Sequence, residues 1–156
     1  MTEDARFRDA RSGPLRLRAL DATDLEVISG LVQDSVFPAS EMTLQRAQRR
    51  FGLLLNRFRW EDARARDAEP ERVRSVLAIE GVMAVRTRGI DREDGGAVQS
   101  LLSIALEPRE DGAGLVTLIL AGGGAVALDV EALEVTLRDV TRPYHAPSGK
   151  VPQHDD

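Results

Sequence analysis

The sequence predicts an α+β fold that is mainly antiparallel β-structure. We expect seven to eight strands in a curled sheet, a sandwich or a partly open barrel, with one N-terminal helix covering a face. Apolar and polar residues alternate with period two in most short segments, helical spacing occurs in one segment near the start, and most connections are of hairpin length. The repeated exchange of strand and helix that a doubly wound parallel sheet requires does not occur.

The chain of 156 residues divides into a folded centre and two tails. Residues 1–13 carry alternating charges without periodicity and lead into a Ser-Gly-Pro sequence, which predicts a flexible arm. Residues 14–142 are expected to form a single globular domain, because a chain of this length can bury about 70% of its unfolded surface. Residues 143–156 are rich in proline, charge and histidine and are expected to be a flexible tail.

The first elements are a strand and the single helix. Leucine and arginine alternate over residues 15–19, which predicts a strand that ends at Asp21. Residues 21–33 then carry apolar side chains on one helical face, namely Leu25, Ile28, Leu31 and Val32. Two starts are open for this helix: Asp21 as the N-cap, or Thr23 as the N-cap with Glu26 completing a capping box.

The rest of the domain is expected to consist of strands. The predicted strand segments are 41–47, 51–60, 73–88, 98–107, 115–120, 125–130 and 133–140. Segment 73–88 is either two strands joined by a tight turn at Gly81 or one bent strand with a bulge there. Glycines 122–124 predict a hairpin, because glycine tolerates the positive φ angles that short hairpin loops need.

Composition excludes several classes of function. The sequence has no cysteine, which removes disulfides, thiolate metal sites and a cysteine nucleophile and fits a reducing compartment. It has neither a signal-peptide pattern nor 18 consecutive apolar residues, so we expect a cytoplasmic protein that does not enter the membrane. The formal net charge of -5 disfavours general nucleic-acid binding, because the averaged field repels phosphate.

Catalytic and metal sites are not indicated, and no cofactor is expected. Both histidines, His145 and His154, lie in the predicted tail, where no neighbouring groups would fix them. The triple glycine precedes a strand and not a helix, and the acids of residues 91–96 lack the EF-hand spacing. An enzyme is therefore the less favoured reading, although two acids could converge from the set Asp21, Asp24, Glu80, Asp91, Asp94 and Asp129.

Residues 49–62 are the most distinctive segment, since they contain the only tryptophan, two of the four phenylalanines and four arginines. In the favoured interpretation Phe58 and Trp60 fill the core beneath the helix, while Arg57 and Arg59 face water. In the alternative, Arg57, Arg59 and Trp60 line a groove for an anionic ligand or a partner. Arg88 is a further binding candidate, although surface ion pairs would explain it equally well.

The chain resembles an alphaproteobacterial family of small proteins known as domain of unknown function 2948. The resemblance covers about residues 15–143 and is carried by Asp24-Leu25, Ile28-Ser29, Arg50-Phe51, Asn56-Arg57-Phe58-Arg59-Trp60, Gly81-Val82, Arg88-Gly89-Ile90-Asp91 and Gly122-Gly123-Gly124. It implies a bacterial cytosolic protein. It implies no activity, substrate or catalytic residue.

Three hypotheses of function follow. The first is a non-catalytic binding or adaptor domain that uses Arg57, Arg59, Trp60 and Arg88, its partner being unknown or another protein. The second is a module for RNA or nucleotides, in which aromatic side chains stack on bases and arginines hold phosphates. The third is an enzyme that uses carboxylates and arginines alone.

Overall fold

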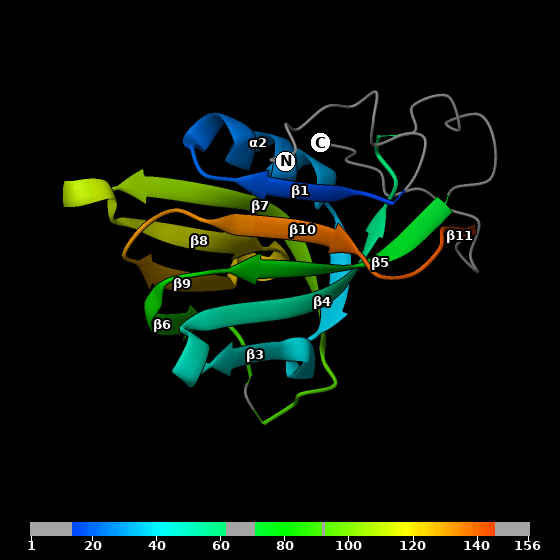
Figure 1. Cartoon of the computed structure of the whole chain (residues 1–156). Coiled ribbons are helices and arrows are strands. Elements are labelled where there is room, and N and C mark those ends of the chain that lie inside the picture. The colour runs from blue at the N-terminus through cyan, green and yellow to red at the C-terminus, as the bar shows by residue number, and fades with distance from the viewer. Residues whose placement is uncertain (1–13, 62–70, 92, 146–156) are drawn as a thin grey trace.

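Eleven strands and one α-helix make up the described part of the chain, which comprises residues 14–61, 71–91 and 93–145 of the computed structural model (Figure 1). The helix is α2 (Ala22–Leu31). The strands are β1 (Arg16–Ala19), β2 (Ser35–Pro38), β3 (Met42–Gln45), β4 (Arg50–Phe58), β5 (Glu71–Ile79), β6 (Val82–Arg88), β7 (Val98–Pro108), β8 (Gly114–Leu120), β9 (Ala125–Val130), β10 (Val135–Asp139) and β11 (Tyr144–His145). The predicted α+β class, mainly antiparallel with one N-terminal helix, is confirmed, and the strand count is slightly higher than expected.

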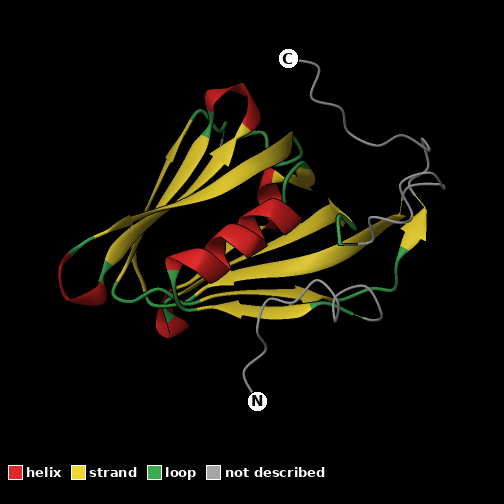
Figure 2. Ribbon diagram, turned by 90° about the horizontal axis from the view of Figure 1, so that it is seen from above, coloured by secondary structure: helices red, strands yellow, loops and turns green. Residues whose placement is uncertain are grey.

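All strand pairs are antiparallel, and the sheet runs in the order β1-β10-β5-β4-β2-β7-β8-β9-β6 without closing. It bends into two layers. In Figure 1 the layer with β1, β10, β5, β4 and β3 lies in front of the layer with β7, β8, β9 and β6. The view from above in Figure 2 shows α2 lying between the two layers, where it contacts β1 and β7. One open side of the bent sheet is therefore covered by the helix.

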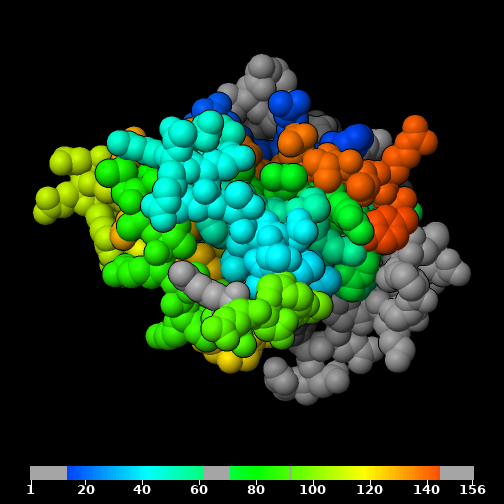
Figure 3. Space-filling model, turned by 90° about the horizontal axis from the view of Figure 1, so that it is seen from below, coloured from blue at the N-terminus to red at the C-terminus, as the bar shows by residue number. Residues whose placement is uncertain are grey.

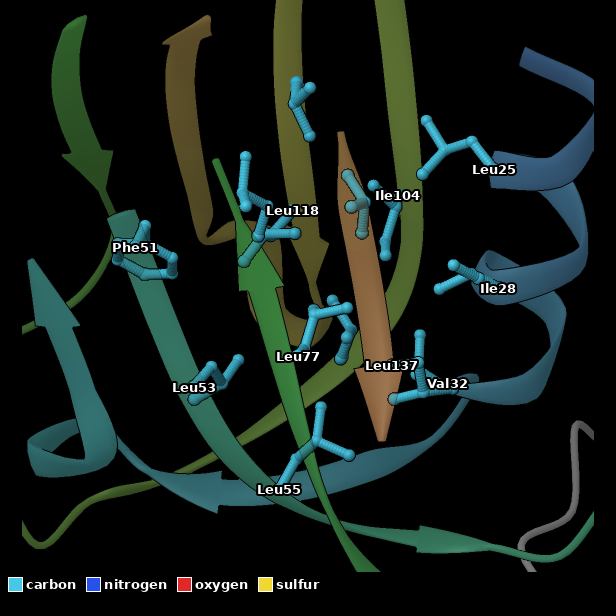
Figure 4. Close-up of a cluster of buried hydrophobic side chains, with 14 of the residues drawn as sticks. Leu25, Ile28, Val32, Phe51, Leu53, Leu55, Leu77, Ile104, Leu118 and Leu137 are labelled. Carbon is cyan, nitrogen blue, oxygen red and sulfur yellow. The ribbon is translucent and has the colours of Figure 1, made fainter. Parts of the chain in front are cut away.

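Helix α2 begins at the first of the two starts that the sequence left open. Asp21 is the N-cap, and its carboxylate accepts a hydrogen bond from the backbone N–H of Asp24 at 2.9 Å. The predicted apolar stripe is buried, and Leu25, Ile28 and Val32 point into the core in Figure 4. The chain then forms β2, a strand that the sequence did not predict because four residues ending in Pro38 resemble a connection.

The predicted hairpin at glycines 122–124 is present, and a further hairpin joins β3 to β4. Strand β3 pairs with β4, and β8 pairs with β9 across a loop in which Gly122 and Gly123 have φ angles of 81° and 89°. At Gly81 the turn is the correct alternative, since β5 and β6 are separate strands. They do not form a hairpin, because β5 pairs with β4 and β10 whereas β6 pairs with β9. Gly81, with φ of 67°, turns the chain from one layer to the other.

The core fills the space between the layers. Figure 4 shows Leu53 and Leu77 of the front layer, Leu118 of the back layer and Ile28 of the helix converging on it. Burying one such side chain contributes about 1.5–3 kcal/mol. On β4 the buried side chains alternate through residues 51, 53, 55 and 57, so the inward face of this strand ends in an arginine.

The expected tail begins with a strand. Tyr144 and His145 form β11, which pairs with the start of β5, although both residues fall within the predicted tail of residues 143–156. The expected arm of residues 1–13, most of the charged loop before β5 and residues 146–156 lie outside the described residues. None of the helices in the described part of the chain has the length and apolar character needed to span a bilayer.

Candidate functional site

Arg57, the first of the predicted site residues, lies inside the protein. Its side chain has 0% exposed surface, so the expectation that Arg57 faces water is wrong. The reason is the register of β4, which places Arg57 on the same inward face as Leu55. A period-two pattern identifies two faces of a strand, but it does not reveal which partner strands cover an arginine at its end.

The guanidinium of Arg57 is fully engaged by protein groups. It donates to both carboxylate oxygens of Glu61 at 2.8 Å and to Asp139 at 2.9 and 3.1 Å. The Oγ of Ser75 at 3.0 Å and the carbonyl of Phe58 at 3.1 Å accept further bonds. All five N–H donors are thus directed at acceptors of the protein, and none is directed at a ligand.

This cluster joins three strands and the residue that precedes a fourth. Arg57 lies on β4, Ser75 on β5 and Asp139 on β10, while the backbone N–H of Leu15, just before β1, donates to Asp139 at 2.8 Å. Burial alone would lower the pKa of the Arg57 guanidinium, but hydrogen bonds and charges from Glu61 and Asp139 outweigh it and raise the pKa. We call Arg57, Glu61, Ser75 and Asp139 the buried arginine cluster. Its contacts hold strands of the fold together.

Arg59 and Trp60 continue the chain past β4 and are held by local contacts. Arg59 is mostly covered and pairs with Glu71. Trp60 is partly buried; its ring lies 5.6 Å from the ring of Phe58, and its indole N–H donates to the carbonyl of Gln33 at 2.9 Å. Phe58 is buried beside the main core and not beneath the helix, with the guanidinium of Arg72 3.9 Å from its ring centroid.

Arg88 lies in the other layer, at the end of β6, and is exposed. The structure therefore does not bring the four predicted site residues together. The acids that could have converged are also dispersed in separate contacts: Glu80 pairs with Arg50, Asp129 pairs with Arg109, and Asp21 caps α2. The described residues include no group of three His, Asp or Glu side chains that could hold a metal ion.

The surface feature that the sequence did not reveal is the free edge of β6. This strand is the last in the sheet order and pairs with β9 alone, so its second edge has no strand partner in the described part of the chain. Strand β3 similarly pairs with β4 alone. A backbone hydrogen bond from the N–H of Val82 to the carbonyl of Arg49, at 2.8 Å, joins the two layers where β6 begins.

Beyond that bond, a pocket of about 420 Å³ separates β3 from β6. It is lined by Leu44, Arg46 and Arg49 on one side and by residues 82–85 on the other. Figure 3, seen from below, shows this face with the cyan region of β3 and its following turn η2 (Arg46–Gln48) beside the green β6. We call this pocket and the free edge of β6 the β6 groove.

The β6 groove contains both apolar side chains and arginines. Leu44 and Val85 are partly buried and pack against the core, while Met83 remains 59% exposed. Arg46, Arg49, Arg86 and Arg88 are the exposed cations around it. Exposed apolar area enclosed by polar residues is characteristic of a surface that binds another molecule.

A second cavity of about 300 Å³ lies where β2 leaves β4 and meets β7. Its lining is mainly apolar, with Val36, Pro38 and Leu54, and its charged members are Glu41 and Arg74. Val98 at its mouth is 69% exposed. No described strand edge borders this cavity along its length in the way β6 borders its groove, so the β6 groove is the stronger candidate site.

Sequence reasoning identified only Arg88 of this site, because no motif marks its other residues. The signal that could have found it is the pair Arg86 and Arg88, at strand spacing, after Gly81 and an apolar run. That pattern is typical of a strand with one exposed basic face, but only the sheet order shows that the strand lies at an edge.

Comparisons with known proteins give one match. The model of a family described as "Protein of unknown function (DUF2948)" matches residues 15–154. Neither the curated proteins nor the solved structures include a match to the chain.

Proposed function

The chain belongs to the DUF2948 family of proteins of unknown function, and from that premise we propose that it is a non-catalytic binding or adaptor domain. Its site is the β6 groove, and its partner is another protein. The partner contributes an extended segment that pairs with the free edge of β6. The observation that carries this proposal is the coincidence of an unpaired strand edge with a pocket beside it that is lined by both apolar and basic side chains.

The physical argument begins with the backbone of β6. An edge strand presents a row of N–H and C=O groups that a second strand can satisfy, and several protein families bind peptides by adding a strand in this way. The seven residues of β6 span about 20 Å, which suits a peptide better than a compact small molecule. The adjacent pocket would receive alternate side chains of the added strand, which gives such binding its selectivity.

The rival functions lack a comparable site. RNA binding through residues 57–60 would need accessible stacking faces, but Phe58 is buried and Trp60 is held by Phe58 and Gln33. We therefore assign Arg57, Arg59 and Trp60 to the structural part of the fold and keep Arg88 in the binding site. We place this function in the domain of residues 14–142 and in a bacterial cytoplasm, which the absence of cysteine supports.

Site-specific photo-crosslinking tests the proposal. A photoreactive amino acid replaces Met83 in the groove or, as the control, Leu20, which is 51% exposed and lies between β1 and α2 in the chain. In Figure 1 β1 and α2 lie at the top of the molecule, whereas β6 lies at the lower left. In cells that express the protein, the Met83 position should give a discrete adduct with one protein, and the Leu20 position should not. The purified partner should then bind the purified chain, and Met83→Asp should weaken that binding.

Two results would overturn the proposal. One is that the Met83 position gives no adduct or the same adducts as the Leu20 position. The other is that the identified protein, once purified, binds the Met83→Asp variant as tightly as the unchanged chain.

A further inference from the structure

We infer that the segment which binds β6 is acidic, with apolar and acidic residues in alternation. This inference rests on the proposed function and specifies the chemistry of the partner. It follows from the two faces that β6 presents on either side of its free edge.

On the inward face of β6, apolar side chains of the added strand would be favoured. The register with β9 places Val85 opposite Leu128 and Thr87 opposite Val126, and both partners are fully buried. Side chains of an added strand that share this face would lie over Val85 and Leu44, at the edge of the core. Directly opposed side chains on neighbouring strands lie about 5 Å apart, so apolar residues there would bury surface that is now partly exposed.

On the outward face of β6, acidic side chains of the added strand would be favoured. Arg86 is opposite Ala127 and Arg88 is opposite Ala125, so alanines of β9 leave both arginines without a charge directly across the strand. The side chain of Arg86 is 66% exposed, and its contact with Asp129 is long, at 3.8 Å, while Asp129 also binds Arg109 at 2.7 Å. A glutamate or aspartate on the added strand would supply the cross-strand charge that β9 lacks.

In the described part of the chain, an arginine without an acidic partner also lies at each of the two ends of the β6 groove. Arg46 lies at the end where β6 begins, and Arg88 lies at the end where β6 stops. Within the described residues, neither side chain forms an ion pair or hydrogen bond, whereas Arg49, which lines the pocket with Arg46, pairs with Glu131 at 2.8 Å. An acidic segment along β6 would therefore meet one arginine at each end and Arg86 between them.

A second copy of this chain does not fit the same edge. Antiparallel pairing of β6 with another β6 over its full length would put Arg86 opposite Ala84 and Arg88 opposite Val82 of the other copy, so neither arginine would meet an acid. In the register centred on Thr87, Arg86 would lie directly opposite Arg88, and like charges directly opposite each other destabilise a strand pair. A nucleic acid would satisfy the arginines, but it would use neither the strand edge nor the apolar side chains of the groove. The groove therefore favours an acidic protein segment over both.

The test uses three labelled peptides of nine residues and fluorescence anisotropy with the full chain. In the first peptide valine alternates with glutamate, in the second valine alternates with lysine, and the third repeats the first with N-methylated amides along one edge. The valine–glutamate peptide should bind about tenfold or more tightly than the valine–lysine peptide. N-methylation should abolish binding, because it removes the donors that pair with β6.

A charge reversal then tests the arginines. The double variant Arg46→Glu, Arg88→Glu should reverse the preference and favour the valine–lysine peptide. The matched control is Arg16→Glu, Arg142→Glu, which changes the net charge equally at exposed positions away from the groove and should keep the original preference. Thermal unfolding of both variants checks that the fold is intact.

The inference is overturned if the two valine peptides bind equally, or if the groove variant keeps the preference for glutamate. It is also overturned if an oligouridylate competes with the peptide and N-methylation has no effect, since the surface would then bind a nucleic acid. If the Met83 position gives an adduct but the groove variant still prefers the valine–glutamate peptide, only the acidic character of the partner is rejected. Absence of that adduct would reject the proposed function itself.

Discussion

Two pairs of arginines in this chain look alike in sequence and occupy opposite environments. Arg57 and Arg59 are two residues apart near the end of β4, and Arg86 and Arg88 are two residues apart near the end of β6. Arg57 is 0% exposed and has every donor engaged, whereas Arg86 is 66% exposed with one long ion pair. The spacing of charges on a strand thus identifies a shared face, but the position of the strand in the sheet decides whether that face is buried.

The difference arises from the neighbours of each strand. Strand β4 lies inside the sheet between β5 and β2, and the acids that meet Arg57 come from Glu61, four residues away, and Asp139, 82 residues away. Strand β6 ends the sheet order and receives one neighbour. The molecule therefore has two contrasting regions. We call the region held by the buried arginine cluster the closed end, and the free edge of β6 at the β6 groove the open edge.

The largest effect that would separate the two regions is the loss of stability at Arg57. Arg57→Ala leaves Asp139 buried without its cation and, among the described residues, leaves Glu61 with only the 4.0 Å contact to Arg59, so we expect a loss of about 3–5 kcal/mol in the free energy of unfolding. Arg86→Ala at the open edge should stay within about 0.5 kcal/mol. Urea unfolding followed by circular dichroism measures both changes.

Arg57→Lys sharpens the same comparison. Lysine keeps the charge but cannot form the two-pronged contact with Glu61, so it should recover only part of the stability that Arg57→Ala loses. Equal stability losses for Arg57→Ala and Arg86→Ala would show that the closed end is not fixed by this cluster.

A smaller effect is expected at the corner that leads into β6. Gly81 has φ of 67°, so Gly81→Ala should cost about 1–2 kcal/mol, and its new methyl group would meet the Glu131 side chain at 3.2 Å. Gly30 lies in α2 with open space around it, and Gly30→Ala should stabilise the protein by up to about 1 kcal/mol. Opposite signs for these two matched changes, measured by urea unfolding, would confirm that the corner constrains the backbone; similar values would contradict it.

Much of the fold could be predicted from the sequence, because local patterns specify it. The apolar stripe ending at Val32 is enough to predict the helix, and the glycines of residues 122–124 are enough to predict the hairpin loop. Both predictions are confirmed. The edge position of β6 and the burial of Arg57 could not be predicted. Both depend on pairings between distant segments, such as β6 with β9 and Arg57 with Asp139, which no local pattern encodes.

A loss of stability smaller than those at Arg57 and Gly81 is expected at Trp60, the only tryptophan of the sequence. Trp60→Phe keeps an aromatic ring beside Phe58 but removes the hydrogen bond to the carbonyl of Gln33, so the free energy of unfolding should fall by about 0.5–1.5 kcal/mol. Because Trp60 belongs to the closed end, the affinity for the valine–glutamate peptide should not change, whereas Arg88→Glu should lower it. If instead Trp60→Phe weakened peptide binding as much as Arg88→Glu does, binding would extend to the closed end, and the division between a structural and a binding arginine pair would have to be abandoned.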